Sequence, residues 1–230
     1  MADAAGSQAA RERREKYHEA DVVVVGAGVF GCAMAYALAN QGRSVILLER
    51  WMHEPDRIVG ELLQPGGVAA LRELGLGHCL DGIDAVPCYG YHILYRGDEV
   101  AFRYPPLKGD GEVVVDAAGN REKYKHGPAA FANGHANGHA NGHANGRADE
   151  HAGRPEGRSF HHGRFIMQLR RACLGHPNIS VFETEVTATV RDDHSHAVLG
   201  VKTLTKDKAT GRKDPDCFFG HLTVVADGYA

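Results

Sequence analysis

One run near the start of the chain, residues 21–49, constrains the fold more than any other part of the sequence. Four valines at 22–25 form a β-branched segment, which is typical of a strand buried on both faces of a parallel sheet. A GxGxxG motif follows. There Gly26 lets the chain turn tightly, Gly28 lets the backbone approach a pyrophosphate, and Gly31 lets the next helix pack closely on the strand. That helix would point unpaired N–H groups and its positive dipole end at the phosphates.

A second apolar segment, Ser44 to Leu48, predicts the next strand, and this segment ends on an acid. Glu49 lies 18 residues after Gly31, where a carboxylate can accept hydrogen bonds from an adenosine ribose. The same carboxylate would repel a 2′-phosphate, so FAD or NAD fits better than NADP. A GxGxxG motif alone is weak evidence, but here strand, helix, second strand and acid come in the expected order. The run therefore predicts a site for an adenine dinucleotide.

The composition argues against several classes of protein. With 230 residues and 43% hydrophobic content, the chain suits one large domain or two small ones. Its formal net charge of −3 argues against a nucleic-acid-binding protein. No apolar stretch reaches the roughly 18 residues that are needed to span a bilayer. The five cysteines are odd in number, widely spaced and without a CxxC pair, which favours free thiols and predicts no metal site.

The chain after Glu49 departs from the repeated βαβ pattern of an NAD dehydrogenase. A polar loop and a short helix come next. They precede a predicted β-hairpin with the strands GYHILYR and EVAFRYP and the turn at Gly97 and Asp98. This layout is typical of a two-domain FAD enzyme that is interleaved in sequence. We therefore predict a flexible N-terminal arm at residues 1–20. The first part of the FAD-binding domain, with the hairpin of the substrate domain, follows at residues 21–107.

The composition changes between residues 108 and 157, where Gly, Ala, Asn and His dominate and NGHA recurs three times. Such a segment buries too little apolar surface to offset its ordering entropy, which predicts a low-complexity surface insertion. Its histidines could bind a metal weakly, but the disordered insertion is the favoured interpretation. Residues 158–230 are predicted to continue the FAD-binding domain. They would form a helix, an antiparallel layer over residues 189–219 and another buried strand at 222–226.

Three stretches resemble the squalene monooxygenases, also called squalene epoxidases. They are EPDRIVGELLQPGG at residues 54–67, GRSFHHGRFIMQLRRA at 157–172 and LTVVADG at 222–228. The first is highly specific, whereas the Asp-Gly pair of the last is shared more widely among flavoprotein hydroxylases. The resemblance implies an α/β fold with a Rossmann-like FAD-binding domain of the flavoprotein hydroxylase type. It also implies inserted antiparallel β elements and a domain that is incomplete at its C-terminal end.

The resemblance further implies an FAD-dependent monooxygenase of sterol biosynthesis. Such enzymes epoxidise squalene to (3S)-2,3-oxidosqualene with molecular oxygen. Their electrons come from NADPH through a separate NADPH-cytochrome reductase at the cytosolic face of the endoplasmic reticulum membrane, the microsomal membrane. The family continues with a second flavin-binding segment, most of the squalene pocket and C-terminal helices that dock on the membrane. Because this sequence stops at Ala230, we expect a part of a longer protein, with little or no epoxidase activity alone.

The resemblance also implies the residues that contact FAD. They are Gly26, Gly28, Val29, Phe30, Gly31, Glu49, Arg50, Arg57, Leu62, Arg170, Val186 and Asp227. The planar guanidinium groups of Arg57 and Arg170 suit phosphate oxygens. Leu62 and Val186 would contact the cofactor through backbone groups, which is why apolar residues occur there.

Two further residues are implied at the active site. Tyr91 matches a hairpin tyrosine beside the substrate cavity, and Gln64 matches a residue that supports it by hydrogen bonding. A tyrosine that is merely packed with its hydroxyl at the rim is an equally good interpretation of the sequence.

Two alternative functions stay open at this point. One is another flavin hydroxylase that acts on a polar aromatic substrate, and the specific run at residues 54–67 argues against it. The other is a non-catalytic escort protein that keeps the fold and binds no FAD. The retained Glu49, Arg57 and motif glycines argue against this second alternative.

Overall fold

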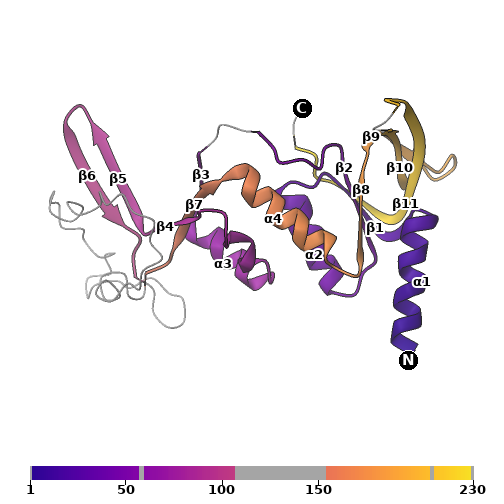
Figure 1. Cartoon of the computed structure of the whole chain (residues 1–230), viewed down its shortest axis with the longest axis horizontal. Coiled ribbons are helices and arrows are strands. Elements are labelled where there is room, and N and C mark those ends of the chain that lie inside the picture. The colour runs from indigo at the N-terminus through magenta and orange to yellow at the C-terminus, as the bar shows by residue number, and fades with distance from the viewer. Residues whose placement is uncertain (1, 57–59, 107–153, 208–209, 229–230) are drawn as a thin grey trace. The chain divides into compact units, whose positions relative to one another are not determined.

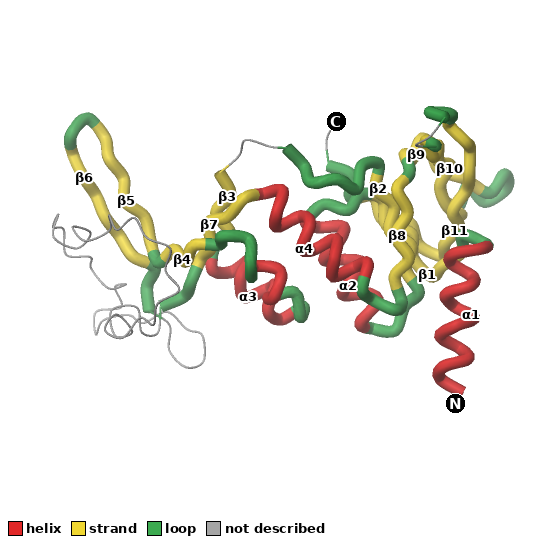
Figure 2. The backbone as a smooth tube through the Cα atoms, viewed as in Figure 1, coloured by secondary structure: helices red, strands yellow, loops and turns green. Residues whose placement is uncertain are grey.

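The structure is a computed structural model that describes residues 2–56, 60–106, 154–207 and 210–228 (Figures 1 and 2). Arg57 and most of the predicted insertion therefore lie outside the described residues. In chain order the elements are α1 (Ala2–Lys16), β1 (Glu19–Val25), α2 (Val29–Asn40), β2 (Val45–Glu49), β3 (Gly60–Leu63), α3 (Pro65–Glu73), the 3₁₀ helix η1 (Gly77–Leu80), β4 (Val86–Cys88), β5 (Gly90–Tyr95), β6 (Asp98–Arg103), β7 (Gly157–His161), α4 (His162–Leu174), β8 (Ile179–Glu183), β9 (Glu185–Arg191), β10 (Val198–Lys206) and β11 (Lys213–Val225).

The chain divides into two compact units. The first contains residues 1–61, 69–85 and 160–230, and the second contains residues 62–68 and 86–159. The first unit holds the nucleotide-binding run and the C-terminal strands, whereas the second holds the hairpin. The two units are thus interleaved in sequence. The segment that follows Glu61 belongs to the second unit, and the predicted domain boundaries stay a prediction.

A six-stranded mixed sheet of order β8-β2-β1-β11-β10-β9 organises the first unit. Strands β8, β2 and β1 run parallel, as their buried apolar sequences predict. Strands β9, β10 and the first half of β11 form an antiparallel layer. The strand-turn-helix-strand prediction for residues 21–49 is confirmed by β1, α2 and β2.

Strand β11 belongs to both parts of this sheet. It is one continuous strand of 13 residues, antiparallel to β10 up to Phe219 and parallel to β1 from Phe219 to Val225. The separate buried strand predicted at residues 222–226 is therefore the second half of β11. Leu222 is 53% exposed and Val225 is 62% exposed, so this half is less buried than predicted. Among the described residues, this half pairs only with β1, which leaves its other edge open.

The parallel strands are buried on both faces. On one face a buried cluster joins them to the antiparallel layer: Ala20, Val23, Val25, Ile46, Leu48, Val201 and Phe218. Alternate residues such as Val24 and Leu47 point to the opposite face and are also fully buried. There α2 packs on β1, β2 and β8, and α4 packs on α2 and β8 (Figure 2). This packing fixes the positions of the helices relative to the strand ends.

The N-terminal segment differs from the predicted flexible arm, because residues 2–16 form the helix α1. Its Arg14 side chain is only 1% exposed. The guanidinium donates to Ser180 Oγ at 3.1 Å, to Ser44 Oγ at 3.1 Å and to the Pro177 carbonyl at 2.6 Å. All three acceptors are distant in sequence, so the polar composition of the segment gives no local sign of this contact.

Replacing Arg14 with Met should test whether this contact holds α1 in place. The variant keeps the apolar stem of the side chain but leaves buried acceptors without a donor, which costs about 1–3 kcal/mol. We expect the free energy of unfolding in urea to fall by that amount. Arg13→Met is the matched control, because Arg13 is exposed and forms an ion pair with exposed Glu19. Equal stability of the two variants would contradict the anchoring role.

The second unit contains the predicted β-hairpin. Strands β5 and β6 pair antiparallel from Gly90 with Arg103 to Tyr95 with Asp98. The two turn residues are Arg96 and Gly97, both with positive φ, which suits a two-residue hairpin turn. The turn thus begins one residue earlier than predicted, since Asp98 already belongs to β6. Within the described part of the chain, none of the helices is both long and apolar enough to cross a membrane.

Candidate functional site

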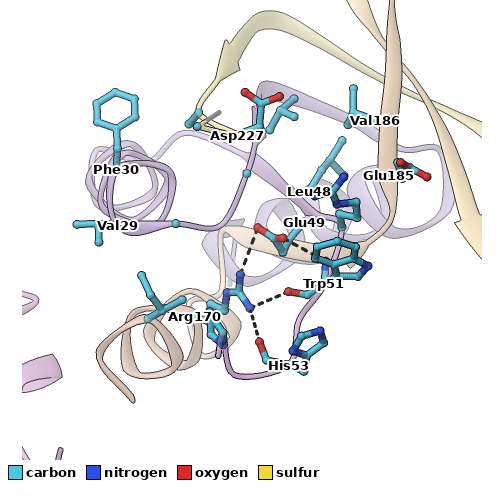
Figure 3. Close-up of a pocket in the computed structure, with 18 of the residues that line it drawn as sticks. Val29, Phe30, Leu48, Glu49, Trp51, His53, Arg170, Glu185, Val186 and Asp227 are labelled. Atoms are coloured by element: carbon cyan, nitrogen blue, oxygen red, sulfur yellow. Dashed lines mark hydrogen bonds and ion pairs between the residues drawn. The ribbon is translucent and has the colours of Figure 1, made fainter. Parts of the chain in front are cut away.

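The carboxyl ends of the parallel strands surround a cavity of about 660 Å³ in the first unit (Figure 3). The phosphate turn, the end of β2, one side of α4, the start of β9 and the end of β11 line it. Ligands of open α/β sheets bind at this edge of the strands. Nine predicted site residues line the cavity: Gly26, Gly28, Val29, Phe30, Glu49, Arg50, Arg170, Val186 and Asp227.

The N-terminus of α2 opens into this cavity. Gly28 is the N-cap residue, no side chain caps the first turn, and the turn contains no acid. The N–H groups at the start of an α-helix have no partner within the helix, and the dipole end there is positive. The side chains of Val29 and Phe30 are largely exposed, at 41% and 57%. This end of α2 therefore offers backbone donors to an anion such as a pyrophosphate.

The three glycines of the motif have different structural roles. A Cβ on Gly31 would lie 1.9 Å from the Gly26 carbonyl oxygen, so the turn and the helix can approach only without it. Gly26 has a φ of +98°, and a Cβ there would meet the Ala226 carbonyl oxygen at 2.5 Å. A Cβ on Gly28, in contrast, would have nothing within 4 Å. The fold thus requires Gly26 and Gly31, whereas the space beside Gly28 is free for a ligand.

Glu49 at the end of β2 is held in a fixed orientation. Its Oε2 accepts from the Ala27 N–H at 2.7 Å, and its Oε1 accepts from the Trp51 N–H at 3.1 Å. Its side chain is 16% exposed. A carboxylate has about four acceptor positions. The remaining capacity of Glu49 suits the hydroxyls of an adenosine ribose, and its contact with the ribose stays a prediction.

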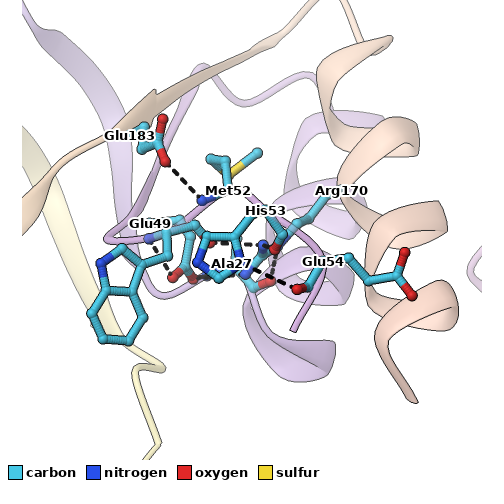
Figure 4. A network of polar contacts seen from close by, with 8 residues as sticks. Ala27, Glu49, Met52, His53, Glu54, Arg170 and Glu183 are labelled. Atoms are coloured by element: carbon cyan, nitrogen blue, oxygen red, sulfur yellow. Dashed lines mark hydrogen bonds and ion pairs between the residues drawn. The ribbon is translucent and has the colours of Figure 1, made fainter. Parts of the chain in front are cut away.

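Arg170 of α4 lies against this carboxylate and is 4% exposed (Figure 4). Its Nη2 lies 3.3 Å from Glu49 Oε2. Its Nε donates to the Ala27 carbonyl at 3.0 Å, and its Nη1 donates to the carbonyls of Trp51 at 2.8 Å and His53 at 3.0 Å. Most of its donors are therefore used within the protein. Arg170 lines the cavity, but these contacts make it a residue that positions Glu49 and the following loop.

Of the predicted FAD contacts that the structure describes, Gly31 and Leu62 do not line the cavity. Gly31 is buried beneath the turn, where it acts through packing. Arg57 lies outside the described residues. Leu62 belongs to the second unit and is 36% exposed. The proposed roles of Arg57 and Leu62 thus stay predictions.

Sequence reasoning missed several residues that line the cavity, among them Trp51, His53, Thr184 and Glu185. Trp51 and His53 follow the predicted Glu49 closely in the sequence, and Thr184 and Glu185 directly precede the predicted Val186. Proximity in sequence to a predicted contact was the only signal that could have found them.

The contact between α2 and α4 includes two thiols. Cys173 Sγ donates to the Cys32 carbonyl at 3.5 Å, and both cysteines are fully buried. The hydrogen bond between the two side chains, together with burial, raises the pKa of the Cys32 thiol. All five cysteines are free. In the ranges that the structure covers, we find no group of three or more side chains suited to a metal ion.

The second unit brings the two predicted active-site residues together. The Gln64 amide donates to the Tyr91 hydroxyl, and the Tyr104 hydroxyl donates to Gln64 Oε1 at 2.9 Å. The rings of Tyr91 and Tyr104 meet edge to face at 5.7 Å. Burial of the hydroxyl is the main cause that raises the pKa of Tyr104, and a hydrogen bond between the Tyr104 and Tyr91 side chains is the second. Tyr104 was not predicted, and its hydroxyl and that of Tyr91 contact the two ends of the Gln64 amide.

Comparison with known proteins connects this geometry to flavoenzymes. A family model described as FAD dependent oxidoreductase matches residues 21–54. Squalene epoxidase ERG1 of Gibberella zeae is 55% identical over 223 residues, which cover 97% of this chain and 39% of that protein. Squalene epoxidase erg1 of Aspergillus fumigatus is 48% identical over 222 residues, covering 96% and 37%. These two relatives contain counterparts of nearly the whole chain.

A solved structure shows the same fold. The probable FAD-dependent monooxygenase pqsL of Pseudomonas aeruginosa superposes with a TM-score of 0.55 at 20% identity, covering 92% of this chain and 43% of its own. The α/β fold of the flavoprotein hydroxylase type is thus confirmed, and the family model confirms the prediction of FAD as the cofactor. The chain spans about two fifths of the length of the curated relatives it matches.

Proposed function

Because this chain belongs to the squalene monooxygenase family, we propose that it is the FAD-binding part of an enzyme that epoxidises squalene to (3S)-2,3-oxidosqualene with molecular oxygen. The observation that carries the proposal is the single cavity that joins the uncapped start of α2, the space beside Gly28 and the oriented Glu49 carboxylate. These groups match the pyrophosphate and ribose of FAD in kind and in order.

Each part of the cavity has a distinct task in this proposal. The first N–H groups of α2 bind the pyrophosphate, and Glu49 accepts hydrogen bonds from the ribose. Arg170 keeps that carboxylate in place through the contacts described above. FAD, when bound, supplies the redox chemistry with oxygen that protein side chains lack. Arg50, Val186 and Asp227 complete the contacts from the cavity wall.

The second unit contributes the substrate side of the proposal. Tyr91, held by Gln64, would lie beside the squalene cavity. Arg57 and Leu62 would add contacts to FAD, as the resemblance implies. A long apolar substrate has no charge to bind, so the protein must orient it by shape and keep water away from the reacting carbon atoms.

We further propose that electrons come from NADPH through an NADPH-cytochrome reductase. The site of action would be the cytosolic face of the endoplasmic reticulum membrane, where squalene and the reductase meet. The chain spans only part of its relatives, so we propose that residues 1–230 alone have little or no epoxidase activity.

The test uses a full-length protein that contains this chain, purified and supplied with squalene, NADPH and the reductase. We expect a flavin absorbance band in the purified protein and the epoxide as product by mass spectrometry. The 230-residue chain run in parallel is expected to form little or no epoxide. A full-length protein that is folded but colourless would refute the proposal in favour of an escort-type protein. A flavin-containing protein that oxidises a polar aromatic compound and leaves squalene unchanged would refute the substrate alone.

A further inference from the structure

Trp51 is the only tryptophan of the chain, and it lines the cavity two residues after Glu49. It is 55% exposed, although tryptophan is highly buried on average. The guanidinium of Arg50 lies over its ring, 3.9 Å from the ring centroid. In Figure 3 the ring lies on the side of Glu49 away from Val29 and Phe30. The ring also stacks with that of His53, at 6.3 Å between the centroids, and it stays more than half exposed at one end of the cavity.

The backbone of Trp51 is held on both sides. Its N–H donates to Glu49 Oε1 at 3.1 Å, and its carbonyl accepts from Arg170 Nη1 at 2.8 Å (Figure 4). Both partners are themselves fixed by further contacts with Ala27. A side chain whose stem is already ordered loses less entropy when a ligand binds to it. The backbone that carries the ring is thus held in place before any ligand arrives.

The order of groups along the cavity indicates which part of a ligand would reach this ring. The Glu49 carboxylate accepts from Ala27, next to the phosphate turn, through one oxygen and from Trp51 through the other. In adenosine diphosphate the ribose likewise lies between the diphosphate and the base. With the diphosphate at α2 and the ribose at Glu49, the base reaches Trp51.

We propose that Trp51 stacks on the adenine of FAD and sets the affinity of this site for adenine nucleotides. The inference rests on the proposed function, because it takes the cavity to hold the ADP half of FAD. An aromatic side chain stacks on a base through the π-faces of both rings. The Arg50 guanidinium on the ring adds a cation–π contact that fixes the indole.

The test uses ADP as the probe and the 230-residue chain as the protein. Isothermal titration should give a dissociation constant about tenfold higher for Trp51→Ala than for the unaltered chain. Trp51→Phe keeps an aromatic ring and should retain most of the affinity. Tyr17→Ala is the matched control, because Tyr17 is an exposed aromatic residue that does not line the cavity. Its dissociation constant should be unchanged.

Fluorescence adds a readout that a merely structural role would not change. The tryptophan emission of this chain comes from Trp51 alone. ADP has no flavin that could accept energy, so a change in emission on titration with ADP reports contact at the ring. Pyrophosphate, which has no base, should leave the emission unchanged.

Two results would overturn the stacking. One is an equal affinity of the unaltered chain and Trp51→Ala for ADP, and the other is an equal change of emission with pyrophosphate and with ADP. If the unaltered chain bound no ADP at all, the proposed function of the cavity would fail and this inference with it. The outcomes therefore distinguish an error about Trp51 from an error about the site.

Discussion

The Gly31→Ala variant is expected to lose about 3 kcal/mol or more of its free energy of unfolding. The added Cβ would lie 1.9 Å from the Gly26 carbonyl oxygen, and this neighbour is backbone rather than a side chain that could rotate away. Relief requires α2 to move off the phosphate turn, and overpacking of this kind costs about 1–3 kcal/mol and sometimes more. Urea unfolding followed by circular dichroism measures the loss.

Gly28→Ala is the matched control, three residues earlier in the same motif. Its Cβ would have no neighbour within 4 Å, and Gly28 has a φ of −82°, which alanine adopts without strain. We expect a stability within about 0.5 kcal/mol of the unaltered chain. The affinity for ADP should nevertheless fall at least about tenfold, because the methyl group fills the space beside the diphosphate. An unstable Gly28→Ala variant or a stable Gly31→Ala variant would contradict this division of roles.

The Arg170→Met variant is expected to lose about 3–5 kcal/mol, since removing one partner of a buried ion pair leaves the other uncompensated. Met keeps the apolar stem, but Glu49 loses its cation and three backbone carbonyls lose their donor. The measurement is again the free energy of unfolding in urea. Arg171→Met is the control, because Arg171 is the next residue of α4 and is exposed. Its stability should stay within about 0.5 kcal/mol of the unaltered chain.

A double variant separates the ion pair from the other contacts of Arg170. Glu49→Gln removes the charge that Arg170 compensates, so the combined variant should lose less stability than the sum of the two single losses. Coupling of about 0.5–3 kcal/mol is typical of residues in direct contact. Strictly additive losses would show that Arg170 acts on the backbone carbonyls alone.

The sequence predicted those parts of the site whose determinants are close together in the chain. The run at residues 21–49 contains its own strand, turn, helix and acid. Periodicity and glycine spacing therefore suffice to predict the part of the cavity that this run lines. The hairpin of β5 and β6 was predicted for the same reason, because its turn and its alternation are local. The shift of its turn by one residue reflects Arg96, whose positive φ no propensity rule favours.

The parts that were missed depend on partners distant in sequence. Arg14 was assigned to an arm, because Ser44 and Ser180 lie 30 and 166 residues away from it. The cofactor contact of Arg170 stays a prediction, but its hydrogen bonds to backbone carbonyls up to 143 residues away were not foreseen. A carbonyl has no signature in a sequence. Such contacts follow only from the packing of α4 on α2.

The shared strand β11 also has a consequence for the order of folding. Val22 of β1 finds one partner in Val45, on the neighbouring β2, but its other partner is Leu222, which comes 200 residues later. During synthesis β1 and β2 emerge early, and the second edge of β1 stays unpaired until the residues of β11 have been made. An unpaired edge of four valines is a template for association with other chains. This topology therefore makes the nascent chain dependent on late closure by β11, or on a chaperone that shields the edge until then.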